Sequence, residues 1–278
     1  MSFSKLKQKL FQYKARWINP ILLRTKYRNR SKYCITLAEV TTCFLTEDYY
    51  SKSWFYPRYD NGRYHEPALT QMLLKDFQQA NTFMDIGAHL GFYTCIAGRI
   101  MKNGVVVGFE MDKLCAELAS NNVAHNCLEN SIVRNVAVTS QPSLVRYKAN
   151  AQPNAGLSIA PNISHDFIEV PSVSVDSYCE DHKITPDLIK IDVEGAEMEV
   201  LKGMKETLGN SPKIYIELHE KQLPKFHSSI LEVISFLHSH HFNVYEIMEH
   251  RNNLQPSLRL ITLDTLPLGN PMVVAVQE

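Results

Sequence analysis

The stretch LIKIDVEGAEMEV, residues 188–200, decides the fold. It begins as a short apolar run of the kind that a buried strand shows, and then Asp192, Glu194, Glu197 and Glu199 follow within eight positions. Burying carboxylates costs free energy unless they gain partners. An apolar strand that ends in acids therefore indicates the edge of an open α/β sheet where a ligand binds.

Strand-like and helical patterns alternate on both sides of this stretch from residue 83 onward, which is typical of an α/β domain with a mostly parallel sheet. The last two strand-like runs have no helix-length pattern between them, so the last strand is expected to pair antiparallel. The pattern predicts a seven-stranded, mostly parallel Rossmann-like sheet with helices on both faces. The seven expected strands are residues 82–87, 104–110, 131–139, 188–194, 213–220, 243–248 and 272–277.

A glycine loop, DIGAHLGFYT, follows the first expected strand at the sheet edge where α/β folds bind ligands. Gly87 allows a tight turn, and Gly91 allows close backbone approach. The spacing lacks the middle glycine of a dinucleotide fingerprint, and Asp85 would repel a pyrophosphate but suits an ammonium group. Glu110 ends the second strand, where nucleotide folds bind ribose hydroxyls. Together these features favour S-adenosylmethionine over NAD as the cofactor.

Six pieces of the chain, in order, resemble the FkbM-type methyltransferases: HEPALTQML, FMDIGAHLGFYT, GFEMD, NNVAHN, DLIKIDVEGAEMEVLKG and IYIELHE. The resemblance runs from about Glu66 to His219. It implies a methyltransferase sheet and S-adenosylmethionine-dependent O-methylation of sugars, glycolipids or polyketide-like secondary metabolites. Two residues depart from the family pattern, since His89 stands where the family usually has Asn and Met111 where it usually has Pro. The first departure touches the geometry of the cofactor loop.

The predicted cofactor-binding residues lie in the glycine loop, at the strand ends and before the first helix. They are Glu66, Asp85, Gly87, His89, Gly91, Tyr93, Thr94, Glu110, Met111 and Asp192.

Four residues at the ends of the fourth and fifth strands, Asp192, Glu194, Glu217 and His219, are the predicted catalytic group, because adjacent parallel strands end at the same edge. An alcohol acceptor needs a base within hydrogen-bond reach or a metal ion that lowers its pKa. Asp192 and His219 are the candidate bases, and His219 is favoured because neutral imidazole is available near pH 7. The other two would orient the acceptor or, with Asp192, ligate a hard cation, but no spacing compels a metal and none is assigned.

Glu197 and Glu199 begin the helix that follows the fourth strand. Their negative charges are expected only to stabilise the positive N-terminal end of that helix. Asn154 and Ser158 lie in an expected loop over the site, where they would meet the ligand or cap turns. The aromatic run YYSKSWFYPRY, residues 49–59, suits stacking on a sugar ring, but burial in the core is the favoured interpretation.

Residues 1–38 carry ten Lys or Arg and no acid, which suggests a basic N-terminal extension over residues 1–60 before a methyltransferase domain at 61–278. Its amphipathic start would either touch an anionic membrane or pack on the domain, and no apolar run is long enough to span a bilayer. Over the whole chain 29 basic residues balance 29 acidic ones, so charge does not indicate nucleic acid, and a small-molecule or carbohydrate substrate is expected. The six cysteines lack paired spacing and suggest a reducing, cytoplasmic compartment.

Four rival functions are weaker. A base-specific nucleic-acid methyltransferase usually carries an Asn/Asp-Pro-Pro-aromatic motif after the fourth strand, and none occurs here. N-methylation of a small molecule or protein remains an alternative. An NAD-dependent oxidoreductase is disfavoured by the missing glycine, and a non-enzymatic module by the acids and histidine beside an intact loop.

Overall fold

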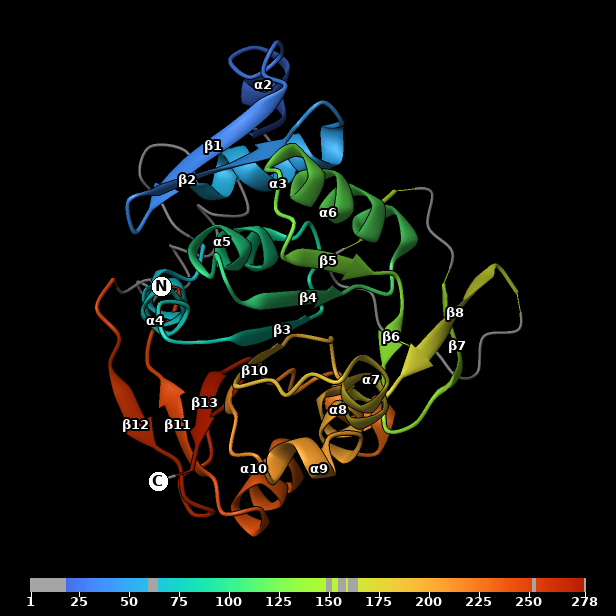
Figure 1. Ribbon diagram of the computed structural model, residues 1–278, viewed down its shortest axis with the longest axis vertical. Coiled ribbons are helices and arrows are strands. Elements are labelled where there is room, and N and C mark those ends of the chain that lie inside the picture. Colours follow the sequence, from blue (N-terminus) through green and yellow to red (C-terminus); the bar gives the residue numbers. More distant parts are fainter. Residues whose placement is uncertain are drawn as a thin grey trace, which may run out of the picture.

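The computed structural model describes residues 19–59, 65–148, 152–154, 159, 165–251 and 254–277. Its centre is an eight-stranded sheet with the order β12-β11-β13-β10-β9-β3-β4-β5 (Figure 1). The strands are β3 (Thr82–Ile86), β4 (Val105–Phe109), β5 (Ser131–Arg134), β9 (Leu188–Ile191), β10 (Lys213–Glu217), β11 (Asn243–Ile247), β12 (Leu258–Leu260) and β13 (Met272–Val276).

All seven expected strands have a counterpart in the main sheet, and the mostly parallel arrangement is confirmed; the third strand ends at Arg134, because residues 137–138 belong to a second sheet. Strands β5, β4, β3, β9 and β10 pair in parallel, whereas β13 pairs antiparallel with both β10 and β11. The predicted number of strands was wrong, because β12 adds an eighth strand by pairing with β11. Its three residues are all exposed, so the sequence has no apolar alternation there to reveal a strand.

Helices cover both faces of the main sheet (Figure 1). On one face lie α4 (Pro67–Asp76), α5 (Phe92–Ile100) and α6 (Lys113–His125); on the other lie α7 (Val175–His182), α8 (Glu197–Lys202), α9 (Lys205–Leu208), η2 (Leu223–Phe226) and α10 (Ile230–Ser239). Successive side chains of β3 point to opposite faces of the sheet. Phe83 therefore packs with the first group of helices, and Met84 and Ile86 pack with the second.

The residues before α4 form α2 (Asn19–Arg24), a hairpin of β1 (Lys32–Leu37) and β2 (Val40–Leu45), and α3 (Tyr49–Tyr59). Phe55 and Tyr59 of α3 are buried with residues of α4 and α5, and Tyr56 is buried too, so burial of the aromatic run is confirmed for these three side chains, whereas Tyr49 is exposed. Most of the amphipathic start, residues 1–18, lies outside the described residues. Among those described, no helix is long and apolar enough to cross a membrane.

A disulfide joins Cys34 to Cys43 across this hairpin, which corrects the expectation that all six cysteines are free thiols. The two residues are direct partners in the antiparallel register of β1 and β2, with a Cα–Cα distance of 4.0 Å. Sequence spacing did not reveal the pair because the hairpin itself was not predicted.

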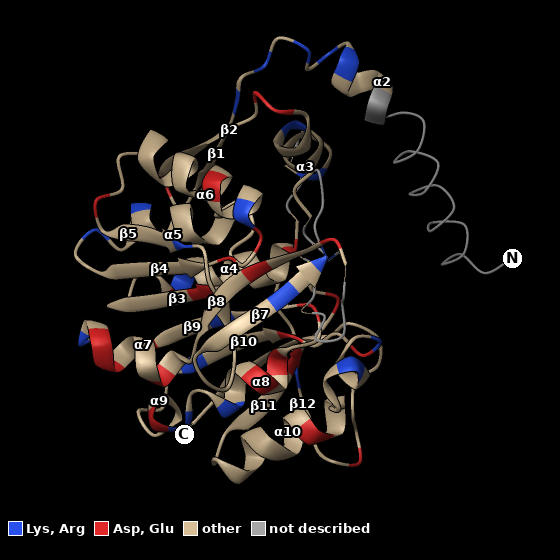
Figure 2. Cartoon of the chain, turned by 90° about the vertical axis from the view of Figure 1, so that its right-hand side faces the viewer, with Lys and Arg blue, Asp and Glu red and all other residues tan. Residues whose placement is uncertain are grey.

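A second sheet of β6 (Ala137–Val138), β8 (Phe167–Val173) and β7 (Ser143–Lys148) stands beside the main one and faces the viewer in Figure 2. The sequence alternates between apolar and polar residues without a clear helical pattern over residues 143–176, and β7 and β8 lie in this stretch. Helix α7 was not predicted, although Ser174 and Ser177 form a capping box at its start. Ser158 lies outside the described residues.

Candidate functional site

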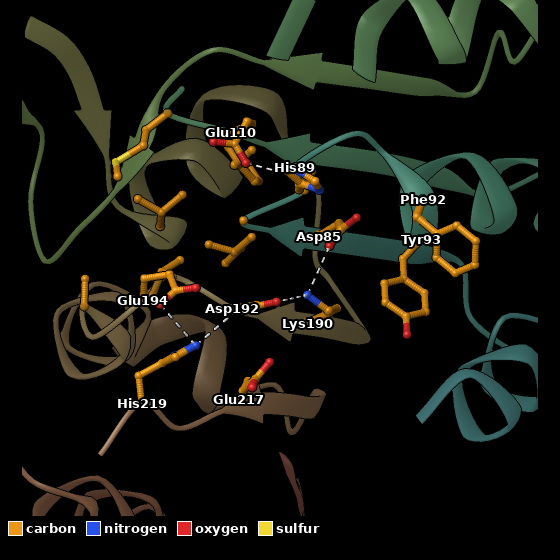
Figure 3. A pocket seen from close by; sticks show the side chains of 18 of the residues that line it. Asp85, His89, Phe92, Tyr93, Glu110, Lys190, Asp192, Glu194, Glu217 and His219 are labelled. Carbon is orange, nitrogen blue, oxygen red and sulfur yellow. Dashed lines mark hydrogen bonds and ion pairs between the residues drawn. The ribbon is translucent and has the colours of Figure 1, made fainter. Parts of the chain in front are cut away.

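A cavity of about 310 Å³ opens at the carboxyl ends of β3, β4, β9 and β10 (Figure 3). The sequence pattern predicted this edge, because the segments that follow these strands carry the glycine loop and the acids. Eleven of the thirteen predicted site residues line the cavity; the two others, Gly91 and Thr94, lie at the start of α5.

The glycine loop is shaped by close backbone packing. Gly87 has φ of 83°, and a Cβ atom there would lie 1.8 Å from the carbonyl oxygen of Asp192. Gly91 has φ of 73° and is the N-cap of α5, where a Cβ would meet Ala119 at 3.2 Å. Both positions therefore require glycine, as the sequence suggested.

Asp85 holds the start of α5 in place. Its Oδ2 accepts hydrogen bonds from the backbone N–H of Thr94 at 3.1 Å and from the Thr94 hydroxyl at 2.7 Å. The side chain is buried, and its Oδ1 lacks a hydrogen-bond partner within the described part of the chain. Burial raises the pKa of Asp85, while Lys190 and Thr94 act against this rise. Its contact with a cofactor ammonium stays a prediction.

Lys190 was missed by the sequence reasoning. It lies in the middle of β9, directly beside Asp85 in the parallel register, with its Nζ 3.2 Å from Asp192 Oδ2 and 4.0 Å from Asp85 Oδ1 (Figure 3). Burial disfavours its charge, but the neighbouring carboxylates outweigh burial and raise the pKa of Lys190. Its place inside an otherwise apolar strand could have revealed it, because a buried lysine needs a buried acid as its partner.

Glu110 lies just beyond β4 on the opposite side of the cavity from the acids of β9 and β10 (Figure 3). Its two oxygens accept the backbone N–H groups of His89 at 2.7 Å and Asp112 at 2.8 Å. Burial raises the pKa of Glu110 to about 7. A carboxylate has about four acceptor positions, so Glu110 retains acceptor capacity for ligand hydroxyls.

The two residues that depart from the family pattern both line the cavity. His89 has φ of 52°, its Nε2 lies 2.7 Å from the Tyr50 hydroxyl, and its ring packs against Trp54 with centroids 4.2 Å apart. Burial lowers the pKa of His89 to about 3, so the ring is neutral near pH 7. Met111 is only partly buried, beside the small sheet. The histidine that replaces the family's usual Asn therefore connects the cofactor loop to α3 through its contacts with Tyr50 and Trp54.

The acids and histidine at the ends of β9 and β10 converge as predicted (Figure 3). His219 Nε2 lies 3.8 Å from Asp192 Oδ1 and 3.5 Å from Glu194 Oε2. Glu217, at the end of β10, pairs with Arg251. Burial opposes the charge on Asp192, but Lys190 and His219 outweigh burial and lower its pKa, so Asp192 is ionised near neutral pH.

The expectation of a neutral His219 near pH 7 does not fit these surroundings. Burial alone would lower its pKa, but the hydrogen bond with Glu197 and the charges of Asp192 and Glu194 raise the pKa of His219 to about 9. The ring is therefore an imidazolium near pH 7, a hydrogen-bond donor rather than a base.

Glu197 lies in the first turn of α8, as predicted, but interaction with the helix N-terminus is not its only role. It is fully buried, and its Oε1 accepts from His219 Nδ1 at 2.7 Å and from the backbone N–H of Gly195 at 2.9 Å. The helical spacing could have predicted this burial, because Glu197 precedes the buried Val200 and Leu201 by three and four positions and so lies on the same helix face. Glu199, by contrast, pairs with Lys202 at the surface.

Glu66 and Tyr93 form the remaining wall of the cavity. Glu66 is buried just before α4 with φ of 56°, and its Oε2 accepts from the Tyr93 hydroxyl at 3.3 Å. Trp54 and Tyr59 of α3 also line the cavity, so the aromatic run contributes to the site as well as to the core. Asn154 lines it too.

The cavity fits a nucleoside bound through its ribose next to a cationic group. Glu110 supplies acceptors for hydroxyls, and the missing Cβ of Gly87 lets the backbone pass close to the chain after β9. Acids on the far side suit a positively charged group.

Comparisons with known proteins agree with this geometry. The methyltransferase FkbM domain model matches residues 85–244, more than half of the chain. The hexuronic acid methyltransferase AglP of Haloferax volcanii is 24% identical over 166 residues, which cover 58% of this chain and 65% of AglP. The chain thus matches just under two thirds of that relative's length.

Two solved structures are similar at low sequence identity. The precorrin-6y C5,15-methyltransferase from Geobacter metallireducens GS-15 is 13% identical, with a TM-score of 0.43 and coverage of 75% of this chain and 87% of that one. The O-methyltransferase from Bacillus cereus in complex with S-adenosylhomocysteine (SAH) is 15% identical, with a TM-score of 0.41 and coverage of 77% and 83%. The strand order, rather than these scores, carries the fold assignment.

Proposed function

Because the chain belongs to the FkbM methyltransferase domain family, we propose that it transfers the methyl group of S-adenosylmethionine to a hydroxyl of a sugar or glycolipid. The observation that carries this proposal is the cluster of Asp192, Glu194, Glu217 and His219 at one end of a cavity whose other end is the Gly87 loop and Glu110. One end thus suits a nucleoside and the other an acceptor.

The residues that would hold the cofactor lie after β3, after β4, before α4 and after β9. Glu110 binds the ribose hydroxyls, and the backbone of the Gly87 loop lies alongside. Glu66 and Asp192 provide negative charge for the cationic end. When bound, S-adenosylmethionine supplies an electrophilic methyl group at this end of the cavity.

The acceptor hydroxyl is held by the charged cluster. Methyl transfer is an in-line displacement, so positioning of the acceptor supplies most of its catalysis. His219 donates a hydrogen bond from Nε2 to the acceptor, while Glu197 fixes the other ring nitrogen. Asp192 is ionised and accepts the hydroxyl proton, which becomes acidic only as the new bond forms. Glu194 and Glu217 orient the sugar.

The sugar class draws support from two observations. Trp54 and Tyr59 present aromatic surface beside the charged cluster, which suits packing against a sugar ring. AglP, the curated relative, is named for action on a hexuronic acid, a sugar that carries both hydroxyls and a carboxyl group.

The test is transfer of labelled methyl from S-adenosylmethionine to neutral sugars, uronic acids and glycolipids, with peptides and small amines as N-acceptor controls. We expect label on a sugar that resists mild base, as a methyl ether does. Label released as methanol would reveal a carboxyl acceptor, and label on the amines alone would support the N-methyltransferase alternative; either result contradicts the proposal.

A second measurement tests the role of the charged cluster. His219→Ala should lower turnover at least about 100-fold, the usual scale of a lost proton-transfer or acceptor-orienting group, while SAH affinity changes little. His125→Ala is the matched control, because His125 is exposed at the end of α6, away from the cavity. Equal loss of turnover and cofactor affinity in His219→Ala would refute the assigned role.

A further inference from the structure

Acidic side chains outnumber basic side chains of permanent charge in the lining of the cavity. The basic side chains of permanent charge that line it are Lys190 and Arg251, within the described part of the chain. Six carboxylates line it as well: Glu66, Asp85, Glu110, Asp192, Glu194 and Glu217. Lys190 is already shared by two of these acids, and Arg251 pairs with Glu217 and lies near Glu66.

Three side chains in this cavity have the arrangement of metal ligands. Asp192, Glu217 and His219 each offer one ligand atom, and these atoms lie within 4.8 Å of one another. Two ligands at about 2.1 Å from an ion are at most about 4.2 Å apart. Shifts of the ligand atoms by roughly half an ångström would therefore bring all three within reach of one ion. The three residues follow two adjacent strands, β9 and β10, which fixes their backbones.

The histidine is oriented as a ligand. His219 is 3% exposed, and its Nδ1–H donates to the buried Glu197. The Nε2 atom faces the cavity, and among described residues its nearest acid partners are at 3.5 and 3.8 Å, beyond good hydrogen-bond length (Figure 3). Metal-binding histidines almost always donate their second nitrogen to a carboxylate or carbonyl in this way.

We propose that a divalent cation of the Mn²⁺ type binds in this cavity through Asp192, Glu217 and His219. Two carboxylate oxygens and one imidazole nitrogen suit a first-row transition metal better than Mg²⁺ or Ca²⁺, which prefer all-oxygen sites. A bound ion would coordinate the acceptor oxygen and lower its pKa, with His219 as ligand in place of hydrogen-bond donor. This catalytic role rests on the proposed function, whereas the binding of the ion does not.

A second group, Glu66, Glu217 and His250, also has ligand atoms within 4.8 Å of one another, and the buried His250 Nε2 lacks a hydrogen-bond partner in the described structure. The Arg251 guanidinium pairs with Glu217, which both groups share, and it also lies 3.9 Å from Glu66, a ligand of the second group alone. His250 is also absent from the cavity lining, in contrast to His219. The group with His219 is therefore the proposed site.

The test is a titration of the full chain with Mn²⁺, followed by electron paramagnetic resonance, without cofactor or acceptor. We expect one bound ion per chain, and affinity at least about tenfold weaker in Glu217→Gln and in His219→Ala. Glu197→Gln should weaken binding about 10- to 100-fold by loosening the histidine. His250→Ala should bind like the wild type.

Absence of a bound ion in the wild-type chain overturns the proposal without any variant. Loss of binding in His250→Ala with retention in His219→Ala also overturns it, because the ion would then lie at the second group. Circular dichroism shows whether each variant is folded. If His219→Ala unfolds, Asp192→Asn is the deciding variant, because Asp192 belongs to the proposed site alone and the amide keeps the side-chain shape. A chain that binds Mn²⁺ but methylates no sugar would refute the proposed function alone.

Discussion

Replacing Lys190 by methionine would remove the ammonium group that lies between two carboxylates. Its Nζ is 3.2 Å from Asp192 and 4.0 Å from Asp85. At an effective dielectric constant of about 20, these attractions amount to about 5 and about 4 kcal/mol, and desolvation of the ions offsets much of this. Removing one partner of a buried ion pair costs roughly 3–5 kcal/mol, because a charge is left without compensation.

For a domain of this size, that loss corresponds to a decrease in Tm of roughly 6–20 °C. The measurement is urea unfolding followed by circular dichroism, with thermal unfolding alongside. Lys213→Met is the matched control, since Lys213 pairs with Asp76 at 2.8 Å but is one-third exposed, and such a pair is worth about 1 kcal/mol or less. A loss in Lys190→Met no larger than in the control would refute the reasoning.

A double variant separates charge from packing. Asp85→Asn removes the most deeply buried acid next to Lys190 while keeping an oxygen that accepts from Thr94. If the cost in Lys190→Met comes from uncompensated charge, the double variant should be more stable than the sum of the two single losses predicts. Strict additivity would show that Lys190 acts through packing instead.

Three further predictions concern the loop, the ribose site and the hairpin. Gly87→Ala should abolish SAH binding or unfold the chain, since its Cβ would lie 1.8 Å from a carbonyl oxygen; Gly269→Ala, also at positive φ but with open space around it, should lose only about 1 kcal/mol in urea unfolding. Burial raises the pKa of Glu110 to about 7, and ribose hydroxyls favour its carboxylate form, so calorimetry should find SAH binding about tenfold weaker at pH 6 than at pH 8. Glu110→Gln should bind more weakly without this pH dependence, and an unchanged dependence would exclude Glu110 as its source. Alkylation of the unfolded, unreduced chain should modify four thiols, because Cys34 and Cys43 are joined; six would contradict the disulfide.

The centre of the sheet could be predicted because strands such as β3, β9 and β10 are almost entirely buried on both faces. Runs such as LIKI and KIYIE stand out as apolar sequences, and the acids that follow them mark the edge where ligands bind. Strand β12 could not be found in this way, since its residues are exposed and its existence depends on pairing with β11. Register likewise depends on tertiary structure, which is why the Cys34–Cys43 pair was missed.

The candidate site was predictable in position but not in electrostatics. The gathering of Asp192, Glu194, Glu217 and His219 follows from adjacent parallel strands. The charge of His219 does not, because it depends on Glu197, a residue that sequence reasoning assigned to the helix end. Protonation states depend on distances that only the folded structure fixes.

The most direct test of the proposed site is a crystal structure of the chain with SAH. We expect the ribose hydroxyls to lie within hydrogen-bond distance of Glu110 and the sulfur atom to point toward Asp192 and His219, at the ends of β9 and β10. An adenosine bound at the His219 end, or SAH bound outside this cavity, would contradict this assignment.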